Sequence, residues 1–183
     1  MIRIICCLFA VLFFTAALQA QQDKAIRKNA LKTTFLSFIT GSGKLTYERT
    51  TFPGQSVEIT GGIIGIGYDK FKVNPKGGLL RAAYKFMFLQ PKNAPLEGLY
   101  IKPEYALSAF DYNSKDMDRI NSFWQTIMGC IGYQWGIKMF ILDGFAGAGV
   151  GWGNSTELKY HHGFIDRYEW LTLTFGIKVG LAF

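Results

Sequence analysis

A short polar segment near the end of the chain contains Ser155, Glu157, Tyr160 and the adjacent pair His161 and His162. A serine, a histidine and an acid can form a nucleophilic triad, in which the histidine takes the serine proton and the acid orients the histidine. The segment therefore raises the hypothesis of a hydrolase. Triads depend on geometry, however, and nothing in the segment orients the two histidines. A polar surface loop without catalytic residues is the preferred interpretation.

The same two histidines also raise the hypothesis of a zinc site. A closed zinc site needs four ligands at characteristic spacings, and no third and fourth ligand accompany the pair in this way. Two glycine-rich segments, Gly61-Gly62 and 147–149, are similar to phosphate-binding loops, but neither precedes a predicted helix. They are interpreted as places where strands bend or leave space. The sequence therefore predicts no metal and no cofactor.

A larger group of ionisable residues is spread along segments in which every second residue is apolar. Alternation of this kind places the ionisable residues on one face of a strand and the apolar residues on the other. Ionisable groups at membrane depth can form a proton or ion path, but a structural network of salt bridges is the preferred interpretation. The predicted network contains Glu48, Glu58, Arg81, Lys85, Lys102, Glu104, Asp143 and Lys178.

The last of these segments, from Tyr168 to Phe183, shows the longest alternation in the chain. One face carries Leu171 and every second residue after it, all of them large and apolar, and the chain ends on the aromatic Phe183. The alternation continues for about fifteen residues, whereas an ordinary strand has about five or six. A strand that crosses a membrane needs about 9–11 residues. The segment is therefore predicted to be a membrane-spanning strand.

Eight such segments are predicted, and an even number allows an antiparallel barrel to close with both termini on one side. The sequence therefore predicts an all-β fold, a closed eight-stranded antiparallel up-and-down transmembrane β-barrel over residues 29–183. Loops one, three, five and seven are expected on the cell surface, and the other connections in the periplasm. The connection at 90–98 is longer than periplasmic turns usually are. The predicted strands are 29–40, 44–52, 56–68, 78–89, 99–111, 123–135, 139–152 and 168–183.

The charged faces decide which side of the barrel faces inward. A lysine or arginine on the lipid face costs about 2–4 kcal/mol at the middle of a bilayer, so the charged residues are expected inside. Eight strands enclose a space wide enough only for side chains, which predicts ion pairs and no open pore. A soluble lipocalin-like barrel, with its apolar face inward, is the alternative. Outward aromatic residues near strand ends are predicted to form an interfacial girdle, with Tyr133, Trp135, Trp152 and Phe183 as its members.

The first twenty residues are predicted to form a cleavable signal peptide, followed by a periplasmic tail at 21–28. Arg3 provides a basic start, residues 4–17 are apolar, and Ala20 is a small residue at the expected cleavage site. An apolar run of fourteen residues is shorter than the roughly twenty that a spanning helix needs. Cys6 and Cys7 precede most of this run, so lipidation is not predicted.

The chain of 183 residues has a formal charge of +7, and removal of the leader with Arg3 leaves +6. A basic balance is typical of nucleic-acid binding, but the chain is predicted to be exported and has no recognition motif, so no nucleic-acid partner is expected. After removal of the leader Cys130 is the single cysteine, which excludes an intramolecular disulfide.

The alternating last strand that ends in Phe183 resembles the C-terminal assembly signal of bacterial outer-membrane barrels. The whole pattern is similar to small eight-stranded outer-membrane barrels, and the runs 29–33 (NALKT) and 45–49 (LTYER) resemble a domain-of-unknown-function family among them. The resemblance implies a Gram-negative outer membrane, the barrel-assembly machinery as a partner of the C-terminal strand, and no established activity. One small barrel of this class removes acyl chains from lipid A with a serine, a histidine and an acid at its rim, which implies a lipid-modifying rim hydrolase as the alternative.

The functional prediction is a non-enzymatic outer-membrane protein whose surface loops serve envelope integrity or surface interaction. Expected partners are outer-membrane lipid and lipopolysaccharide, whose phosphates attract the loop lysines Lys70, Lys72 and Lys76. The barrel is expected to be a monomer.

Overall fold

The computed structural model describes residues 27–69, 72, 74–91, 94–113, 119–154, 165–166 and 171–183. The predicted signal peptide and residues 21–26 of the predicted tail lie outside these ranges. Strands account for most of the described residues, and none of the described helices is long and apolar enough to cross a membrane. The elements are β1 (Asn29–Thr34), η1 (Phe35–Thr40), β2 (Ser42–Phe52), β3 (Gln55–Ile64), β4 (Lys76–Met87), β5 (Gly98–Asn113), β6 (Arg119–Ile137), β7 (Phe140–Gly153), β8 (Ile165–Asp166) and β9 (Leu171–Ala182).

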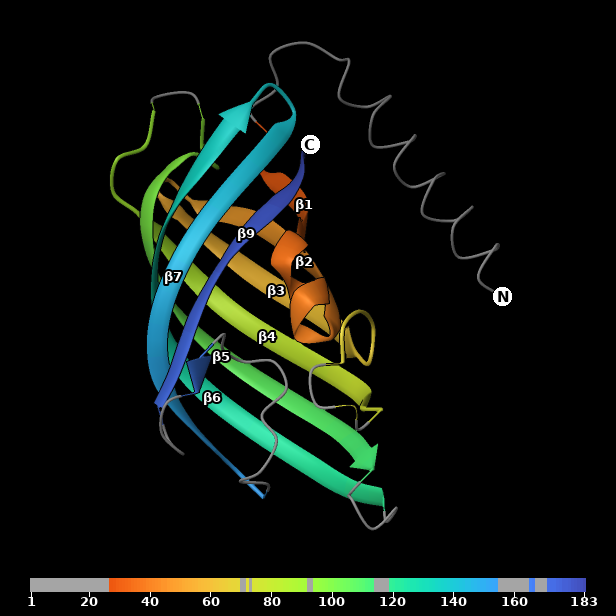
Figure 1. Ribbon diagram of the computed structural model, residues 1–183. Helices are drawn as coiled ribbons and strands as arrows, with labels where there is room; N and C mark the ends of the chain where they lie inside the picture. Colours follow the sequence, from red (N-terminus) through yellow and green to blue (C-terminus); the bar gives the residue numbers. More distant parts are fainter. Residues whose placement is uncertain are drawn as a thin grey trace, which may run out of the picture.

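One sheet contains all of these strands, and Figure 1 shows it curving around a central axis. Each strand from β1 to β7 pairs antiparallel with the next, β7 pairs with β9, and β9 returns to pair with β1. The two-residue β8 adds only a short pairing to β9. The wall therefore consists of eight strands, and the prediction of a closed eight-stranded antiparallel up-and-down barrel is confirmed. Asn29 and Phe183 exchange two backbone hydrogen bonds, of 3.0 and 2.9 Å, so the start of β1 and the end of β9 lie side by side at one end of the barrel.

Burial alternates along every long strand, because successive side chains of a strand point to opposite faces. In β5 the pattern of exposed and buried residues has a period of two over nearly all of its sixteen residues. Phe86 and Phe175 are 39% and 44% exposed on the outer wall, whereas Arg81 and Lys178 are only 7% and 4% exposed. The apolar rows thus face outward, and the charged rows face the barrel interior.

The first strand is shorter than predicted, because the chain leaves the wall after Thr34 and continues as the 3₁₀ helix η1. The Ser37 hydroxyl donates a hydrogen bond to the Thr34 carbonyl (2.6 Å), which satisfies a backbone acceptor at the point where the strand ladder stops. Gly41 ends η1 with a φ of 74°, in the left-handed region that glycine adopts readily. The turn therefore lies at Gly41, and Ser42 and Gly43, predicted as turn residues, already belong to β2.

The third strand also ends early, at Ile64 and not at the predicted Tyr68. Gly65 and Gly67 both have positive φ, so the backbone turns out of the sheet there. The Gly65 amide donates a hydrogen bond to the Gly41 carbonyl, and the Tyr68 amide donates one to the Phe38 carbonyl; both bonds are 2.9 Å long. The residues after β3 therefore pack against η1, because their backbone groups find partners there and not in the sheet.

Apolar clusters close both ends of the barrel interior. At the end where the termini lie, Leu96 is only 3% exposed and packs with residues of β1, β7 and β9. Leu96 belongs to the long connection between Met87 and Gly98, so the extra length of that connection lets it fold inward and fill the barrel mouth. At the other end, side chains from β3, β4 and β5 form a second cluster. The two clusters are Ala30, Leu96, Ile141 and Ala182 at the first end and Ile64, Leu79, Phe110 and Tyr112 at the second.

Candidate functional site

A network of charged side chains fills the barrel between the two apolar clusters. Each of its members occupies an inward position of the alternating pattern, so the charged groups of seven strands meet near the axis. All are buried, with at most 7% of any residue exposed. The members are Lys32 on β1, Glu48 on β2, Glu58 on β3, Arg81 and Lys85 on β4, Lys102 and Glu104 on β5, Asp143 on β7 and Lys178 on β9.

Two carboxylates of the network lie directly opposite each other on neighbouring strands, because Glu48 of β2 is the register partner of Glu58 of β3. Like charges in this position are destabilising. The Lys32 ammonium offsets the repulsion, since its Nζ lies 2.6 Å from Glu48 Oε2 and 2.5 Å from Glu58 Oε1. Lys85 Nζ lies 3.4 and 3.1 Å from the same two carboxylates. The β2–β3 register is thus compatible with folding only because cations from β1 and β4 reach this point.

Asp143 brings a third carboxylate to the same place from β7. Its Oδ2 lies 2.8 Å from Lys32 Nζ and 2.9 Å from Lys85 Nζ, and its Oδ1 accepts a 2.5 Å hydrogen bond from the Tyr100 hydroxyl. Gln134 completes the group, because its Oε1 accepts from both lysines and its Nε2 donates to a carboxylate oxygen of Glu48. Every polar atom of this group therefore has a charged or strongly polar partner.

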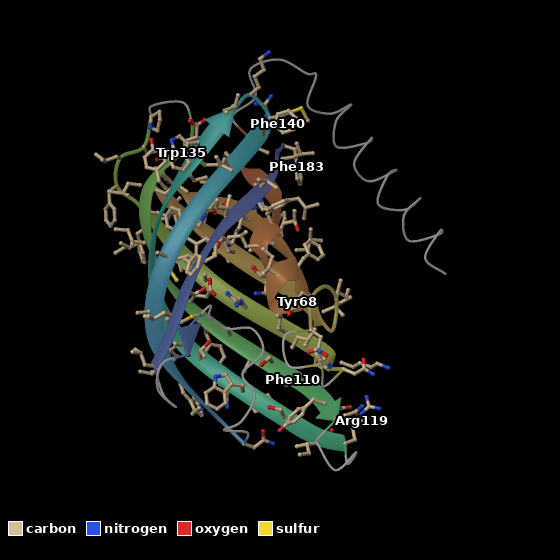
Figure 2. The ribbon with its side chains drawn as sticks, in the orientation of Figure 1. Tyr68, Phe110, Arg119, Trp135, Phe140 and Phe183 are labelled. Atoms are coloured by element: carbon tan, nitrogen blue, oxygen red, sulfur yellow. The ribbon has the colours of Figure 1, made fainter. Side chains whose placement is uncertain are left out.

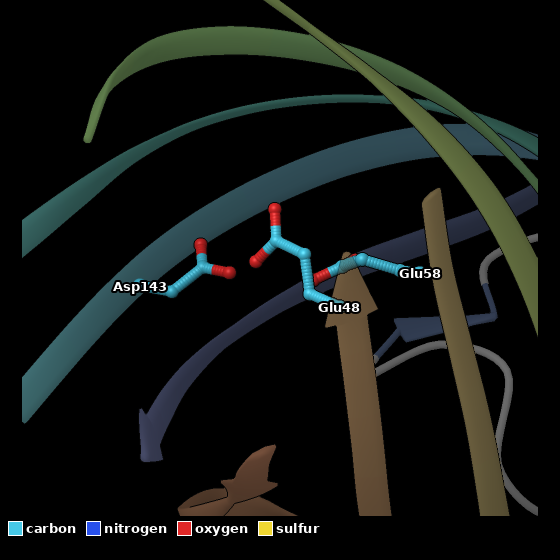
Figure 3. A group of neighbouring side chains, drawn as sticks. All are labelled: Glu48, Glu58 and Asp143. Carbon is cyan, nitrogen blue, oxygen red and sulfur yellow. The ribbon is translucent and has the colours of Figure 1, made fainter. Parts of the chain in front are cut away.

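The three carboxylates of Glu48, Glu58 and Asp143 have the spacing of ligands in a metal centre. Figure 3 shows Glu48, Glu58 and Asp143 converging, and one oxygen of each lies within 4.8 Å of the others. Oxygen ligands of this kind suit a hard divalent cation. The Lys32 ammonium, however, contacts all three carboxylates within 2.8 Å, at the point where a shared cation would bind. The arrangement is therefore a binding site for a lysine side chain of the protein itself.

The network continues along the interior as a chain of alternating charges. Glu58 Oε2 lies 3.0 Å from Lys102 Nζ and 2.9 Å from Lys178 Nζ. Glu104 then bridges Lys102 and Arg81, with a distance of 2.8 Å to each. Each of the four carboxylates in the network thus pairs with at least two cations.

Aromatic rings support several of the cations from the side. Lys85 Nζ lies 4.1 Å from the centroid of the Tyr100 ring. The Phe145 ring contacts two ammonium groups, with its centroid 4.9 Å from Lys102 Nζ and 5.2 Å from Lys178 Nζ. A cation over an aromatic face is attracted by the ring quadrupole, so these contacts add to the attraction that the carboxylates exert on the same three lysines.

The balance of charge decides what the network can do. Its five cations and four anions leave a net charge of +1. Burying an ion costs roughly several kcal/mol unless ion pairs of good geometry and further hydrogen bonds offset this cost. Here the ion pairs provide that compensation, and they also occupy the carboxylate oxygens that a general base or a metal ligand would need free. The geometry is that of a structural element that fixes the strands relative to one another.

Sequence reasoning named eight of these nine residues, and the structure brings all eight together. It missed Lys32, which contacts three carboxylates, as Lys85 does; no other described residue contacts as many. The signal was present, because Lys32 alternates with Leu31 and Thr33, whose side chains lie on the outer wall. Tyr100 and Gln134 were on predicted inward faces, but sequence alone gave no reason to expect them beside Asp143.

The four weak candidates for rim catalysis, Ser155, Glu157, His161 and His162, all lie outside the described residues. The proposed girdle residues are placed as follows. Trp135 and Phe183 lie at the end of the barrel that contains the termini (Figure 2), and Trp152 lies near the end of β7 away from the termini. These three are between 38% and 47% exposed, whereas Tyr133 is half-buried with its ring 4.5 Å from that of Trp135.

No family model, no curated protein and no solved structure matches this chain. The function is therefore inferred from the barrel, from the direction in which its side chains point and from the charge network.

Proposed function

We propose that this chain is a non-enzymatic β-barrel protein of the bacterial outer membrane. The observation that carries the proposal is the outer wall, on which large apolar side chains from the barrel strands are exposed. Ile63, Leu80, Ile127 and Ile131 are each more than half exposed on this wall. Soluble monomers rarely expose a continuous apolar surface larger than a few hundred Å², and a bilayer is the environment in which such a wall is favourable.

The interior supports a role without transport. A bundle of ion pairs fills the middle, and the two apolar clusters cover it at both ends. An eight-stranded barrel leaves room only for side chains. The barrel then acts as a rigid support whose surface loops serve envelope integrity or surface contact, as a monomer among outer-membrane lipids and lipopolysaccharide.

Features outside the wall agree with this location. The first twenty residues have the composition of a cleavable signal peptide. The soluble lipocalin-like alternative requires the opposite orientation, with the apolar rows inside. A rim hydrolase has no support from any contact of the described residues.

Cell fractionation and conductance together test the proposal. The protein is expected in the outer-membrane fraction, extractable only with detergent, and its band on a gel is expected to shift when the sample is heated. Reconstituted into a planar bilayer, it is expected to show no ion current above that of the lipid alone. Labelled lipid A incubated with the barrel is expected to remain intact. Recovery from the soluble periplasmic fraction without detergent would contradict the membrane location, and release of an acyl chain would contradict the non-enzymatic role.

A further inference from the structure

A groove runs along the outer wall over β1, which has only six residues. It encloses about 890 Å³, and its lining comes from β1, β2, β3 and β9 together with Phe38 of η1 and Ile66 of the loop after β3. Volumes of about 300–1,000 Å³ are typical of ligand pockets. Aliphatic side chains such as Leu45, Ile59 and Val179 line the sides of the groove.

Glycines create the depth of the groove. Gly43 and Gly61 occupy outward positions of β2 and β3, where neighbouring residues carry large side chains. An added Cβ on Gly61 would meet no atom within 4 Å, and one on Gly43 would only reach the side chains of Phe38 and Ile66 at 3.6 and 3.8 Å. Neither backbone needs glycine for its conformation, since neither residue has a positive φ. The absence of side chains at Gly43 and Gly61 therefore keeps the groove open, and the fold does not require glycine at either position.

The two ends of the groove differ in polarity. At one end it is closed by the apolar side chains of Phe38 and Ile66. At the other end the Tyr47 hydroxyl donates a 2.8 Å hydrogen bond to the side chain of Asn29, and Arg49 follows Tyr47 on the same face of β2. The backbone register pairs Asn29 with Arg49. Arg49 is exposed, and no acidic side chain among the residues that the structure describes forms an ion pair with it.

Arg49 lies two residues beyond Tyr47, the last lining residue on β2, and the distance from the glycines of the groove to Arg49 matches one leaflet of a membrane. The six steps from Gly43 to Arg49 span about 20 Å at roughly 3.3 Å per residue. With a strand tilt near 45°, this is about 14 Å along the membrane normal, close to half of the hydrocarbon core of about 30 Å. A lipid with its tail in the groove would therefore place its headgroup at the height of Arg49.

We propose that this groove binds one phospholipid from the leaflet nearest the chain termini, with an acyl chain along the glycines and the phosphate at Arg49. The inference rests on the proposed membrane location. A guanidinium forms paired hydrogen bonds with phosphate oxygens, and the Asn29 amide lies beside it as a further polar group. The bound chain fills the outer surface of the wall where β1 pairs over only five residues with each neighbour.

The test compares two matched glycine variants in bilayer nanodiscs of phosphatidylglycerol and phosphatidylethanolamine. Gly61→Phe fills the groove. Gly129→Phe is the control, because Gly129 lies on β6, across the barrel, and a Cβ there also meets no atom within 4 Å. Arg49→Gln removes the cation and leaves the groove open. After gentle transfer to detergent, native mass spectrometry counts the phospholipids that remain on each barrel.

The wild-type barrel and Gly129→Phe are expected to retain one phospholipid. Arg49→Gln is expected to retain about tenfold less phospholipid, the loss expected when a charge-assisted contact is removed. Gly61→Phe is expected to retain about tenfold less as well, because the added ring occupies the space of the acyl chain. Equal retention by Gly61→Phe and Gly129→Phe, or no lipid on the wild type, overturns the proposal. A dimer that Gly61→Phe dissociates overturns it as well, because the groove would then be an interface between copies. Protection of the strands from protease in the nanodisc reports insertion separately, so a barrel that inserts without retaining lipid contradicts the lipid site but not the membrane location.

Discussion

The middle of the barrel interior and its two ends are both closed, but by opposite kinds of side chain. In the middle, Lys32 and Lys85 each contact three carboxylates, and removal of any member takes one partner away from at least one buried charge. At the ends, residues such as Leu96 and Phe110 pack in clusters of buried apolar side chains. The loss of an apolar residue removes its own contacts and leaves its neighbours satisfied. The middle is therefore expected to be the less tolerant of the two regions, although both are equally buried.

The outer wall completes the comparison, because there the solvent is expected to be hydrocarbon. A lysine or arginine is stabilised by carboxylates in the middle of the barrel, but one placed on the outer wall would have no such partner. Four substitutions test this comparison, from the buried network, through the apolar end and the outer wall, to the exposed rim.

The largest effect is expected for Lys32→Met, which keeps the length of the side chain and removes its charge. Glu48, Glu58 and Asp143 would then lose the ammonium that lies between them, and breaking a buried ion pair in this way costs about 3–5 kcal/mol. The free energy of unfolding, from urea titration followed by tryptophan fluorescence, measures the loss. Leu31→Met is the control, because the neighbouring Leu31 points to the outer wall.

A second substitution sharpens the result. Adding Glu48→Gln to Lys32→Met removes one of the three carboxylates that lost the Lys32 ammonium, so the double variant is expected to be more stable than Lys32→Met alone. A loss below about 1 kcal/mol for Lys32→Met, the range of exposed ion pairs, would show that the middle does not depend on this contact.

At the apolar end, Leu96→Ala is expected to cost about 2–5 kcal/mol, since it leaves a cavity in the cluster that fills the barrel mouth. Leu89→Ala is the matched control from the same connection, because Leu89 is 68% exposed. The same urea titration compares the two variants. If both lose the same free energy, Leu96 does not close this end of the barrel.

On the outer wall, Ile127→Arg is expected to cost about 2–4 kcal/mol in a bilayer, the range measured for a cation on the lipid face at mid-depth. Ile127 lies at the middle of β6 and is 52% exposed. Ile127→Leu keeps the wall apolar and serves as the control. Unfolding of the reconstituted barrel in lipid vesicles gives the measurement. An Ile127→Arg barrel as stable as the control would mean that this wall faces water.

The smallest effect is expected at the rim, where Arg119 and Asp111 form an ion pair of 3.2 Å between β6 and β5. Both side chains are well exposed, 57% and 39%, so water screens their attraction. Arg119→Gln is expected to cost about 0–1 kcal/mol, against the several kcal/mol expected at Lys32. Arg119→Lys keeps the charge and controls for shape. A loss as large as that of Lys32→Met would remove the distinction between buried and exposed pairs.

Much of the fold could be predicted, because alternation is a local property of an extended chain. The inward positions of Glu104 and Asp143 and the outward position of Phe175 follow from period two alone. The end of the first strand could not be predicted in this way. The predicted strand continues through residues 35–40, but the hydrogen bond from Ser37 to Thr34 and the left-handed Gly41 give these residues a 3₁₀ helix. A local preference that competes with the ladder is not visible in hydrophobic periodicity.

The charge network shows a second limit. Sequence reasoning could place a residue on the inner face, but not at a height along the axis. The proximity of Lys32, Glu58 and Asp143 depends on the registers of strands that are far apart in the chain. The long connection that contains Leu96 could not be interpreted for the same reason, since its target, the mouth between β1, β7 and β9, exists only after the barrel closes.

The sequence by itself determined the alternation, the number of strands in the wall and the face on which each charge lies, because these depend only on the geometry of a single strand. The tertiary structure decided which charges meet, that Lys32 lies between three carboxylates, that Leu96 fills the mouth and that a groove opens over β1. These features depend on the register between strands and on closure of the β1–β9 seam, and closure joins residues at opposite ends of the chain.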